Sequence, residues 1–300
     1  MAALGIIGIS GKQLARRVVT RIGNHDVFGG AAQLAYYFFL ALFPMLLFLL
    51  SAVALVSGKG SPVESNLISY IGRVAPPDAT GLIQKTIAQT FDASGGLKAM
   101  FAIIGALWAG SQGVASLMST LNCAYNVQET RPFWKRRALA LWVTIAGSLL
   151  ITIGVALLTV GQTVASRLTR AETLVVFARW IWYLAEWPVI VVLLLVAFGI
   201  IYYWVPNAEH PQWHWITPGA IVALTLWFIA SFGLRYYLEF FNTYSRTYGA
   251  LTAVIVILLW FYVTGAAILI GGEVNSEVEQ ANRGGAVCAW CGNKMAVPPE

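Results

Sequence analysis

Charged residues are scarce in this chain of 300 residues, of which they make up 11%, whereas a soluble domain carries about 25%. Hydrophobic residues make up 58% and are spread over the whole length, so no polar segment is long enough to fold as a soluble catalytic domain. This composition excludes an ordinary soluble enzyme. It predicts a polytopic membrane protein that functions in or beside the bilayer.

Cysteine and histidine are scarce as well, with three residues of each. Three cysteines are too few for the disulfide framework of a secreted domain. The sequence also lacks a nucleophile elbow, a metal-binding helix motif and a phosphate-binding loop. These absences exclude ATP-driven pumping by this chain and argue against an enzyme, and we expect no cofactor.

The net charge is +6, but no basic stripe is long enough to follow a nucleic-acid duplex. We therefore expect no nucleic-acid partner. Anionic lipid head groups on the cytoplasmic side fit the excess of positive charge better.

Apolar segments near the roughly 20 residues that cross the hydrocarbon core as a helix recur along the chain. The sequence therefore predicts an all-α fold, a polytopic transmembrane helix bundle of about six spans. These spans cover about 31–57, 97–119, 138–163, 180–204, 216–240 and 250–272. The second span contains small and polar residues and should face other helices, because small residues permit close helix approach.

The chain divides into three predicted parts. Residues 1–30 should form a cytoplasmic basic amphipathic helix, because Lys12, Arg16, Arg17 and Arg21 alternate with apolar residues at helical spacing. Residues 31–279 make the six-helix transmembrane domain, with short amphipathic helices in the first extracytoplasmic loop. Residues 280–300 should be a flexible tail. Dense basic clusters beside the first spans favour a cytoplasmic location for both termini.

Polar residues within or beside the spans are candidates for function, because a charge at the bilayer centre costs roughly 2.5 to 3.5 kcal/mol on insertion scales. Arg235 and Glu239 lie four residues apart and form either an ordinary pair at a helix end or part of a cavity. Glu186 needs a partner, for which Arg235 or Arg246 is available, unless it lies at the head-group boundary. Pro44 either kinks the first span at a binding site or only shapes its packing. The full candidate set for a cavity or gate is Gln33, Pro44, Glu186, Arg235, Glu239, Tyr244, Arg246 and Tyr248.

Three smaller sets lie near the predicted inner face and in the tail. One set either caps helices, which we favour, or lines an inner mouth: Asn122, Asn126, Glu273 and Asn275. Another set either contacts lipid phosphates or only sets the topology: Arg131, Lys135, Arg136 and Arg137. The CxxC motif of the tail supplies half of a zinc site, so metal binding there would need a second chain: Cys288 and Cys291.

Several ordered sequence blocks resemble the YihY / virulence factor BrkB family over roughly residues 30–280. They are Phe39-Leu-Ala-Leu-Phe-Pro44, Asn122-Cys-Ala-Tyr-Asn-Val127, Arg131-Pro-Phe-Trp-Lys-Arg-Arg137, Leu259-Trp-Phe-Tyr262 and Gly272-Glu-Val-Asn275. The resemblance implies a multi-pass protein of the bacterial inner membrane with six helices. It also implies that an earlier ribonuclease label of the family is a mislabel, and it brings no agreed functional residues.

Two functional hypotheses follow. The first is a transporter or flippase-like exporter that moves an amphipathic or anionic substrate through a polar cavity in the bundle. The alternative is a non-transporting envelope scaffold or lipid-binding protein, and either could act as a homo-oligomer. A nuclease role is not expected. The polar segment from Arg235 to Gly249 should lie at the outer rim, since Arg235 is about 30 Å along its helix from Trp215.

Overall fold

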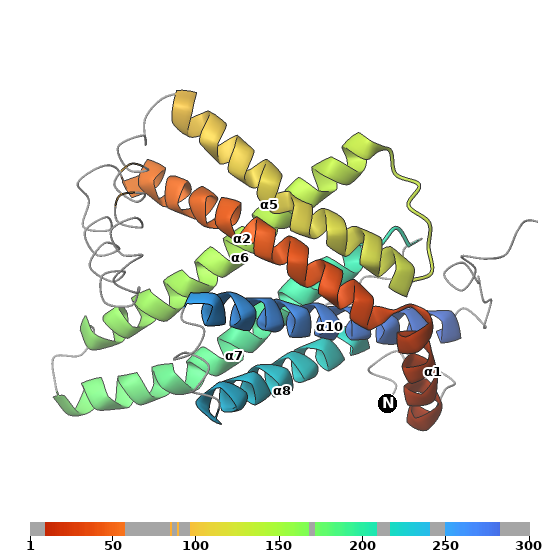
Figure 1. Ribbon diagram of the computed structural model, residues 1–300. Coiled ribbons are helices and arrows are strands. Elements are labelled where there is room, and N and C mark those ends of the chain that lie inside the picture. Colours follow the sequence, from red (N-terminus) through yellow and green to blue (C-terminus); the bar gives the residue numbers. More distant parts are fainter. Residues whose placement is uncertain are drawn as a thin grey trace, which may run out of the picture. The chain divides into compact units, whose positions relative to one another are not determined.

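The structure is a computed structural model that describes residues 10–57, 85, 89, 97–167, 172–208, 217–240 and 250–282. Its regular elements in these ranges are all helices (Figure 1). The all-α prediction is therefore confirmed. The helices are α1 (Gly11–Asn24), α2 (Val27–Ser57), α5 (Leu97–Ala124), α6 (Phe133–Arg167), α7 (Glu172–Trp204), α8 (Pro218–Phe240) and α10 (Ala250–Asn282).

Four helices contain segments that are long and apolar enough to cross a membrane. These segments are Phe133–Gly154, Trp187–Trp204, Pro218–Tyr237 and Val254–Ala281, and α2 adds the shorter apolar segment Val27–Leu42. A multi-pass membrane protein is thus supported, while the number of six spans stays a prediction. Several helices continue beyond their predicted spans, because hydropathy detects the apolar part of a helix and not its polar ends.

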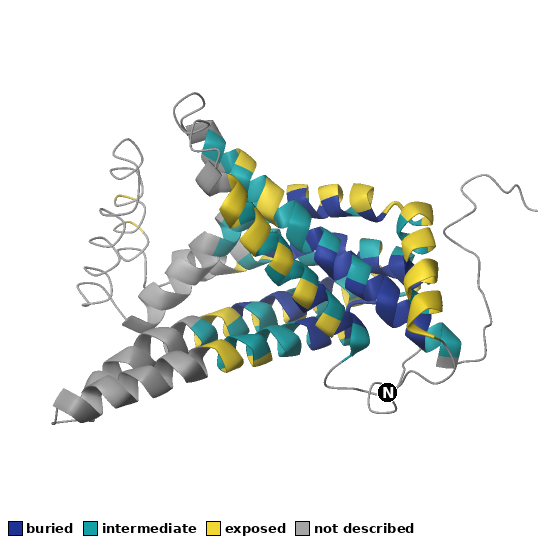
Figure 2. Ribbon diagram, turned by 90° about the horizontal axis from the view of Figure 1, so that it is seen from below, coloured by how far each residue is buried: buried dark blue, intermediate teal, exposed yellow. Residues whose placement is uncertain are grey.

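The chain forms two compact units, and we describe each by itself. The first consists of residues 1–39 and 114–300, and the second of residues 40–113. In the first unit α8 packs along α10, α6 packs along α7, and α1 contacts α10. Figure 2 shows buried residues gathered along the C-terminal half of α10, where residues 271–278 are all buried. This part of α10 is the centre of the unit.

Two glycines let α8 and α10 approach each other closely. A Cβ atom at Gly219 would collide with the backbone carbonyl of Gly271, and a Cβ atom at Gly271 would meet the carbonyl of Gly219 at 2.6 Å. Close by, the Tyr202 hydroxyl donates a hydrogen bond of 2.8 Å to the carbonyl of Ile268. Small residues thus bring the two backbones together, as in other membrane helix pairs.

The second unit holds the continuation of α2 and the first part of α5. Pro44 lies inside α2. Gly110 of α5 faces Met45 of α2, since a Cβ atom at Gly110 would lie 3.8 Å from the Met45 sulfur. Gly110 and Ser111 are buried whereas Gln112 is exposed, so the small and polar residues of this segment do not all face other helices.

Candidate functional site

The turn between α1 and α2 positions a group of charged and polar side chains around a buried carboxylate of the first unit. Ser10 and Gln13 form a capping box that begins α1, and Val18 is the buried residue of this helix. Asp26 takes a left-handed conformation with φ of 46°, which aspartate tolerates better than most residues. Its carboxylate accepts a hydrogen bond of 3.2 Å from Gly29 N and so caps α2. This turn places Arg21 and His25 against α10.

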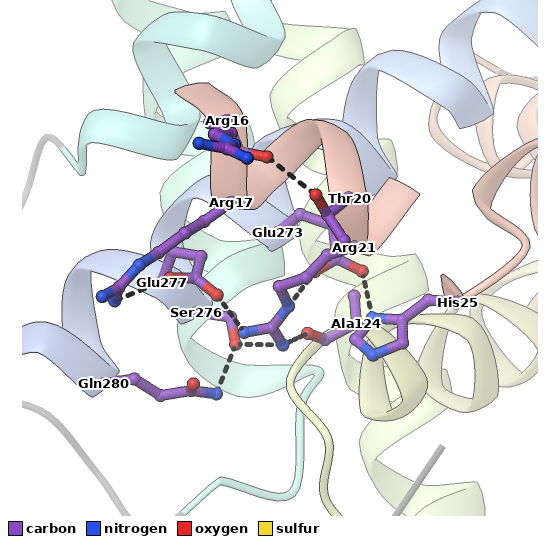
Figure 3. A network of polar contacts seen from close by, with 10 residues as sticks. All are labelled: Arg16, Arg17, Thr20, Arg21, His25, Ala124, Glu273, Ser276, Glu277 and Gln280. Atoms are coloured by element: carbon purple, nitrogen blue, oxygen red, sulfur yellow. Dashed lines mark hydrogen bonds and ion pairs between the residues drawn. The ribbon is translucent and has the colours of Figure 1, made fainter. Parts of the chain in front are cut away.

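Glu273 of α10 is the centre of this group, and its side chain is fully buried. Its Oε1 atom lies 2.6 Å from His25 Nδ1. Its Oε2 atom lies 2.9 Å from Arg21 Nε as an ion pair, although the geometry is not that of a hydrogen bond. Figure 3 shows how both side chains reach the same carboxylate. A buried carboxylate needs such pairing because its desolvation is costly.

Arg21 extends the network along α10 and to α5. Its Nη1 atom donates to Glu277 Oε1 at 2.8 Å, and its Nη2 atom donates to Ala124 O at 2.9 Å and to Ser276 Oγ at 3.0 Å. One guanidinium group therefore links three helices through their polar atoms. Arg17 adds a weaker ion pair with Glu277 at 3.8 Å, and its side chain is 59% exposed.

The hydrogen bond to Glu273 determines the tautomer of His25. An ionised carboxylate can only accept, so the proton lies on His25 Nδ1. In a neutral imidazole the Nε2 atom then carries a lone pair. In the part of the chain that the structure describes, the His25 imidazole makes no other hydrogen bond. Nε2 is therefore available to a group that enters from outside the network.

A pocket of about 320 Å³ borders this network. Its volume is at the lower end of the range for small-molecule sites, roughly 300 to 1,000 Å³. The turn between α1 and α2, the start of α2, α5 and α10 supply its walls. It is lined by His25, Asp26, Val27, Gly29, Gly30, Gln33, Ser119, Thr120, Cys123, Ala124, Leu269 and Glu273. The charged or titratable side chains of this lining include two carboxylates and one imidazole.

A family model described as virulence factor BrkB matches residues 18–287, which is most of the chain. The chain belongs to the virulence factor BrkB family. The resemblance found in the sequence is thereby confirmed. In the described part of this BrkB-family protein, no group of three or more histidine, cysteine or acidic side chains could hold a metal ion.

Two relatives show the breadth of the family. The chain is 32% identical over 272 residues to YfkH of Bacillus subtilis (strain 168), named a ribonuclease-like protein, with 89% of this chain and 96% of YfkH covered. It is 26% identical over 261 residues to the UPF0761 membrane protein XAC0937 of Xanthomonas axonopodis pv. citri (strain 306), with 86% of this chain covered. The chain spans 59% of the length of the Xanthomonas protein. No solved structure matches.

Two of the residues singled out in the BrkB-family sequence meet in the pocket, namely Gln33 and Glu273. Arg235 is exposed and lies about 24 Å further along α8 than Gly219, at roughly 1.5 Å per residue. Gly219 N donates to Asn275 Oδ1 at 2.7 Å, which anchors the start of α8 beside Glu273 on α10. The structure therefore does not bring Gln33 and Arg235 together.

Other residues of the predicted cavity cannot be placed in a site. Pro44 belongs to the second unit. The side chains of Glu186 and Glu239 lie outside the described part, as do the predicted gate residues Tyr244, Arg246 and Tyr248 and the tail residues Cys288 and Cys291.

Asn275 joins the start of α8 to α10 through both ends of its amide. Its Oδ1 atom accepts from Gly219 N, and its Nδ2 atom donates to Thr217 Oγ1 at 3.0 Å. The buried hydroxyl of Tyr125 lies within hydrogen-bond reach of the same side chain. Burial raises the pKa of Tyr125 above its usual value, and the hydrogen bond with Asn275 opposes part of this effect.

Asn122 belongs to a second group of polar contacts, which connects the loop after α5 to the end of α7. Its Nδ2 atom donates to Glu129 Oε2 at 2.9 Å, and its Oδ1 atom accepts from Asn207 N at 2.7 Å. Arg131 donates to Asn207 Oδ1 at 2.9 Å and to Pro206 O at 2.6 Å. Asn126 forms the turn that follows α5, with φ of 56°. These contacts hold helix ends.

The basic residues at the start of α6 divide into two kinds. Arg136 donates to the carbonyl of Ala115 at 3.1 Å, and Arg137 is buried. Lys135 is exposed and lies over the Trp134 ring, 5.6 Å from its centroid. Of the four predicted lipid-contacting residues, Lys135 is thus the one whose charge lies at the surface of the described structure.

Arg21, His25 and Glu277 were missed as site residues. The sequence places Arg21 in the predicted basic amphipathic helix of residues 1–30 and predicts no site role for His25 or Glu277. A usable signal was present: Arg21 and His25 are four residues apart, and so are Glu273 and Glu277. Residues four apart lie on one face of a helix. The basic pair Arg21 and His25 can therefore meet the acidic pair Glu273 and Glu277 when the two helices pack together.

Proposed function

We propose that this BrkB-family membrane protein is a transporter or flippase-like exporter, and that the pocket beside Glu273 is part of the path of a small amphipathic solute. The observation that supports the proposal most strongly is the position of Glu273. This carboxylate is fully buried, lies in the apolar segment Val254–Ala281, and borders a pocket. Ionisable residues within membrane segments commonly line substrate or ion paths.

The lining of the pocket narrows the class of solute. The sequence suggested an amphipathic or an anionic substrate. Two carboxylates, those of Asp26 and Glu273, line the pocket, and Arg21 balances the charge of Glu273. The charge of Asp26 remains and repels an anion. An amphipathic solute with a neutral or positive polar group fits better, because Val27 and Leu269 supply apolar contacts. A nucleic-acid phosphodiester fits poorly for the same electrostatic reason.

Exposed residues on α1 and, separately, at the start of α6 favour the alternative of a lipid-binding scaffold. Arg16 and Arg17 are exposed on α1, and Val19 is 68% exposed beside them. Phe133 and Trp134 at the start of α6 are 75% and 67% exposed. Exposed cations next to exposed apolar side chains suit a head-group layer. Such a surface would anchor a transporter as well, so a test must address the pocket.

Cys123 provides that test because it lines the pocket and the other two cysteines lie in the tail. With Cys288 and Cys291 replaced by serine, Cys123 is the sole thiol. We expect a membrane-impermeant methanethiosulfonate to modify it in right-side-out and in inverted vesicles, because a transport path opens to each side in turn. The rates on the two sides should differ.

A matched control uses Met118, which lies on the same helix and is fully buried in the core. In a chain with all three cysteines replaced by serine, Met118→Cys should react on neither side until the protein is denatured. Modification of Cys123 from one side alone would refute the transport proposal and favour the scaffold. Failure of Cys123 to react from either side, with full reaction in SDS, would show that the pocket is sealed.

A further inference from the structure

We infer that the pocket binds a small organic ammonium ion through the carboxylate of Asp26 and the free lone pair of His25. The inference rests on the proposed function, because it names the class of solute for the same pocket. It makes a bound proton the direct competitor of that solute.

The charges around the pocket leave a net attraction for a cation. Glu273 is already balanced by Arg21, whose Nε lies 2.9 Å from its Oε2. Asp26 is exposed, and within the described residues its carboxylate accepts one hydrogen bond, from Gly29 N, and has no ion-pair partner. No lysine or arginine is among the described residues that line the pocket. The unbalanced charge at this wall is therefore negative.

His25 adds a directional acceptor to this charge. Its Nδ1 atom is held by Glu273 at 2.6 Å, which leaves Nε2 as the atom that can accept an N–H from a solute. The side chain is 11% exposed and lines the pocket. A primary ammonium group has three donors, enough for both Asp26 and His25. A carboxylate solute has no donor for either group.

Protonation of His25 would oppose the solute in two ways. It would convert Nε2 from an acceptor to a donor, and it would add a positive charge to the wall. The charged and titratable groups of the network and pocket that include the imidazole are Arg21 of α1, Asp26 of the turn, Cys123 of α5, and Glu273 and Glu277 of α10. Since acid favours the bound proton, affinity for the ammonium ion should fall as the pH falls.

The size and the neutral lining define the solute further. At roughly 30 Å³ for a water-sized group, the pocket holds about ten non-hydrogen atoms. Gln33 and Ser119 can bind a further polar group, while Val27 and Leu269 can contact a short alkyl chain. A short primary alkylamine in its protonated form combines these features.

The experiment compares propylammonium with propionate, which have similar size and opposite charge. Binding to the full chain in neutral-lipid nanodiscs is measured by calorimetry at several pH values between 5 and 8. We expect propylammonium to bind at pH 8 and to lose at least tenfold in affinity at pH 5, while propionate gives no binding. Equal binding of both probes, or binding of neither, would overturn the inference.

Two conservative variants separate the roles of the two groups. Asp26→Asn keeps an oxygen for Gly29 N but removes the charge, and it should weaken propylammonium binding about tenfold and retain the pH dependence. His25→Asn places an amide N–H near the position of Nδ1 but lacks Nε2, and it should bind weakly at every pH. Arg17→Gln is the control and should bind as the unmodified chain does.

Retention of the full pH dependence by His25→Asn would refute the role of His25. A melting temperature unchanged from that of the unmodified chain shows that a variant is folded, so that loss of binding reports the site. The binding experiment tests the class of solute and the vesicle experiment tests transport, so either hypothesis can be refuted without the other. Propylammonium binding with Cys123 reactive from one side alone supports the site and refutes transport. Reaction of Cys123 from both sides without propylammonium binding supports transport and refutes this class of solute.

Discussion

Replacement of Glu273 by glutamine tests whether the buried ion network holds α1 on α10. The substitution keeps the side-chain volume but removes the charge that faces Arg21 at 2.9 Å and His25 at 2.6 Å. Breaking a buried ion pair by removing one partner costs about 3 to 5 kcal/mol. Arg21 keeps its bond of 2.8 Å to Glu277, so we expect a loss near the lower end, about 3 kcal/mol.

Arg17→Gln is the matched control for the same network. It removes the pair with Glu277, whose atoms are 3.8 Å apart, from a side chain that is 59% exposed. Solvent screens such a pair, and we expect a loss of about 0.5 kcal/mol or less. The two substitutions thus differ in burial and in distance from the opposite charge, while both remove one charge from the network.

The measurement is the free energy of unfolding from titration with SDS, followed by the fluorescence of the 12 tryptophans. Thermal unfolding in the same detergent gives a second readout, in which about 3 kcal/mol corresponds to roughly 6 °C for a chain of this size. A loss for Glu273→Gln no larger than that for Arg17→Gln would refute the reasoning. It would mean that the network contributes little to stability and that apolar packing holds α1.

Two further substitutions test the other contacts that organise the first unit. Gly219→Ala should destabilise the protein by about 1 to 3 kcal/mol, because its Cβ would collide with the carbonyl of Gly271. Gly147→Ala in α6 has no atom within 4 Å of its Cβ, so in the same thermal assay it should not destabilise the protein and should stabilise it by up to about 1 kcal/mol, because alanine favours a helix more than glycine does. Arg131→Ala should speed proteolysis of the loop after α5 by several-fold, because it releases the carbonyl of Pro206. Truncation of the exposed Lys135 should leave the cleavage rate unchanged.

The helical architecture could be predicted because apolar composition and helix length constrain it directly. The C-terminal extent of α10 could not be predicted from hydropathy, because the last turns of the helix carry polar residues and the pattern counts only apolar ones. Glu273, Ser276 and Glu277 are helical and buried in the structure because Arg21 binds all three. Their burial depends on a partner from the other end of the chain, which local sequence does not reveal.

The candidate site could be predicted only in part, because local sequence does not reveal which distant residues meet. Gln33 and Glu273 were recognised as polar residues near membrane segments, and the structure places both at one pocket. Their partner His25 has no predicted role, because its four-residue spacing from Arg21 gains meaning only when it is matched with the same spacing between Glu273 and Glu277 on another helix. Grouping Gln33 with Arg235 required knowledge of which helix ends meet, and one sequence gives little information on helix pairing.

Stability alone does not account for the buried network. Well-packed apolar residues in place of a buried ion pair are often as stabilising or more so, because they avoid the desolvation cost. Apolar residues could therefore hold α1 on α10 without Arg21 and Glu273. They could not hold His25 Nδ1, which lies 2.6 Å from Glu273 and leaves Nε2 without a hydrogen-bond partner among the described residues. The network is thus better explained by what it presents to the pocket than by what it contributes to folding.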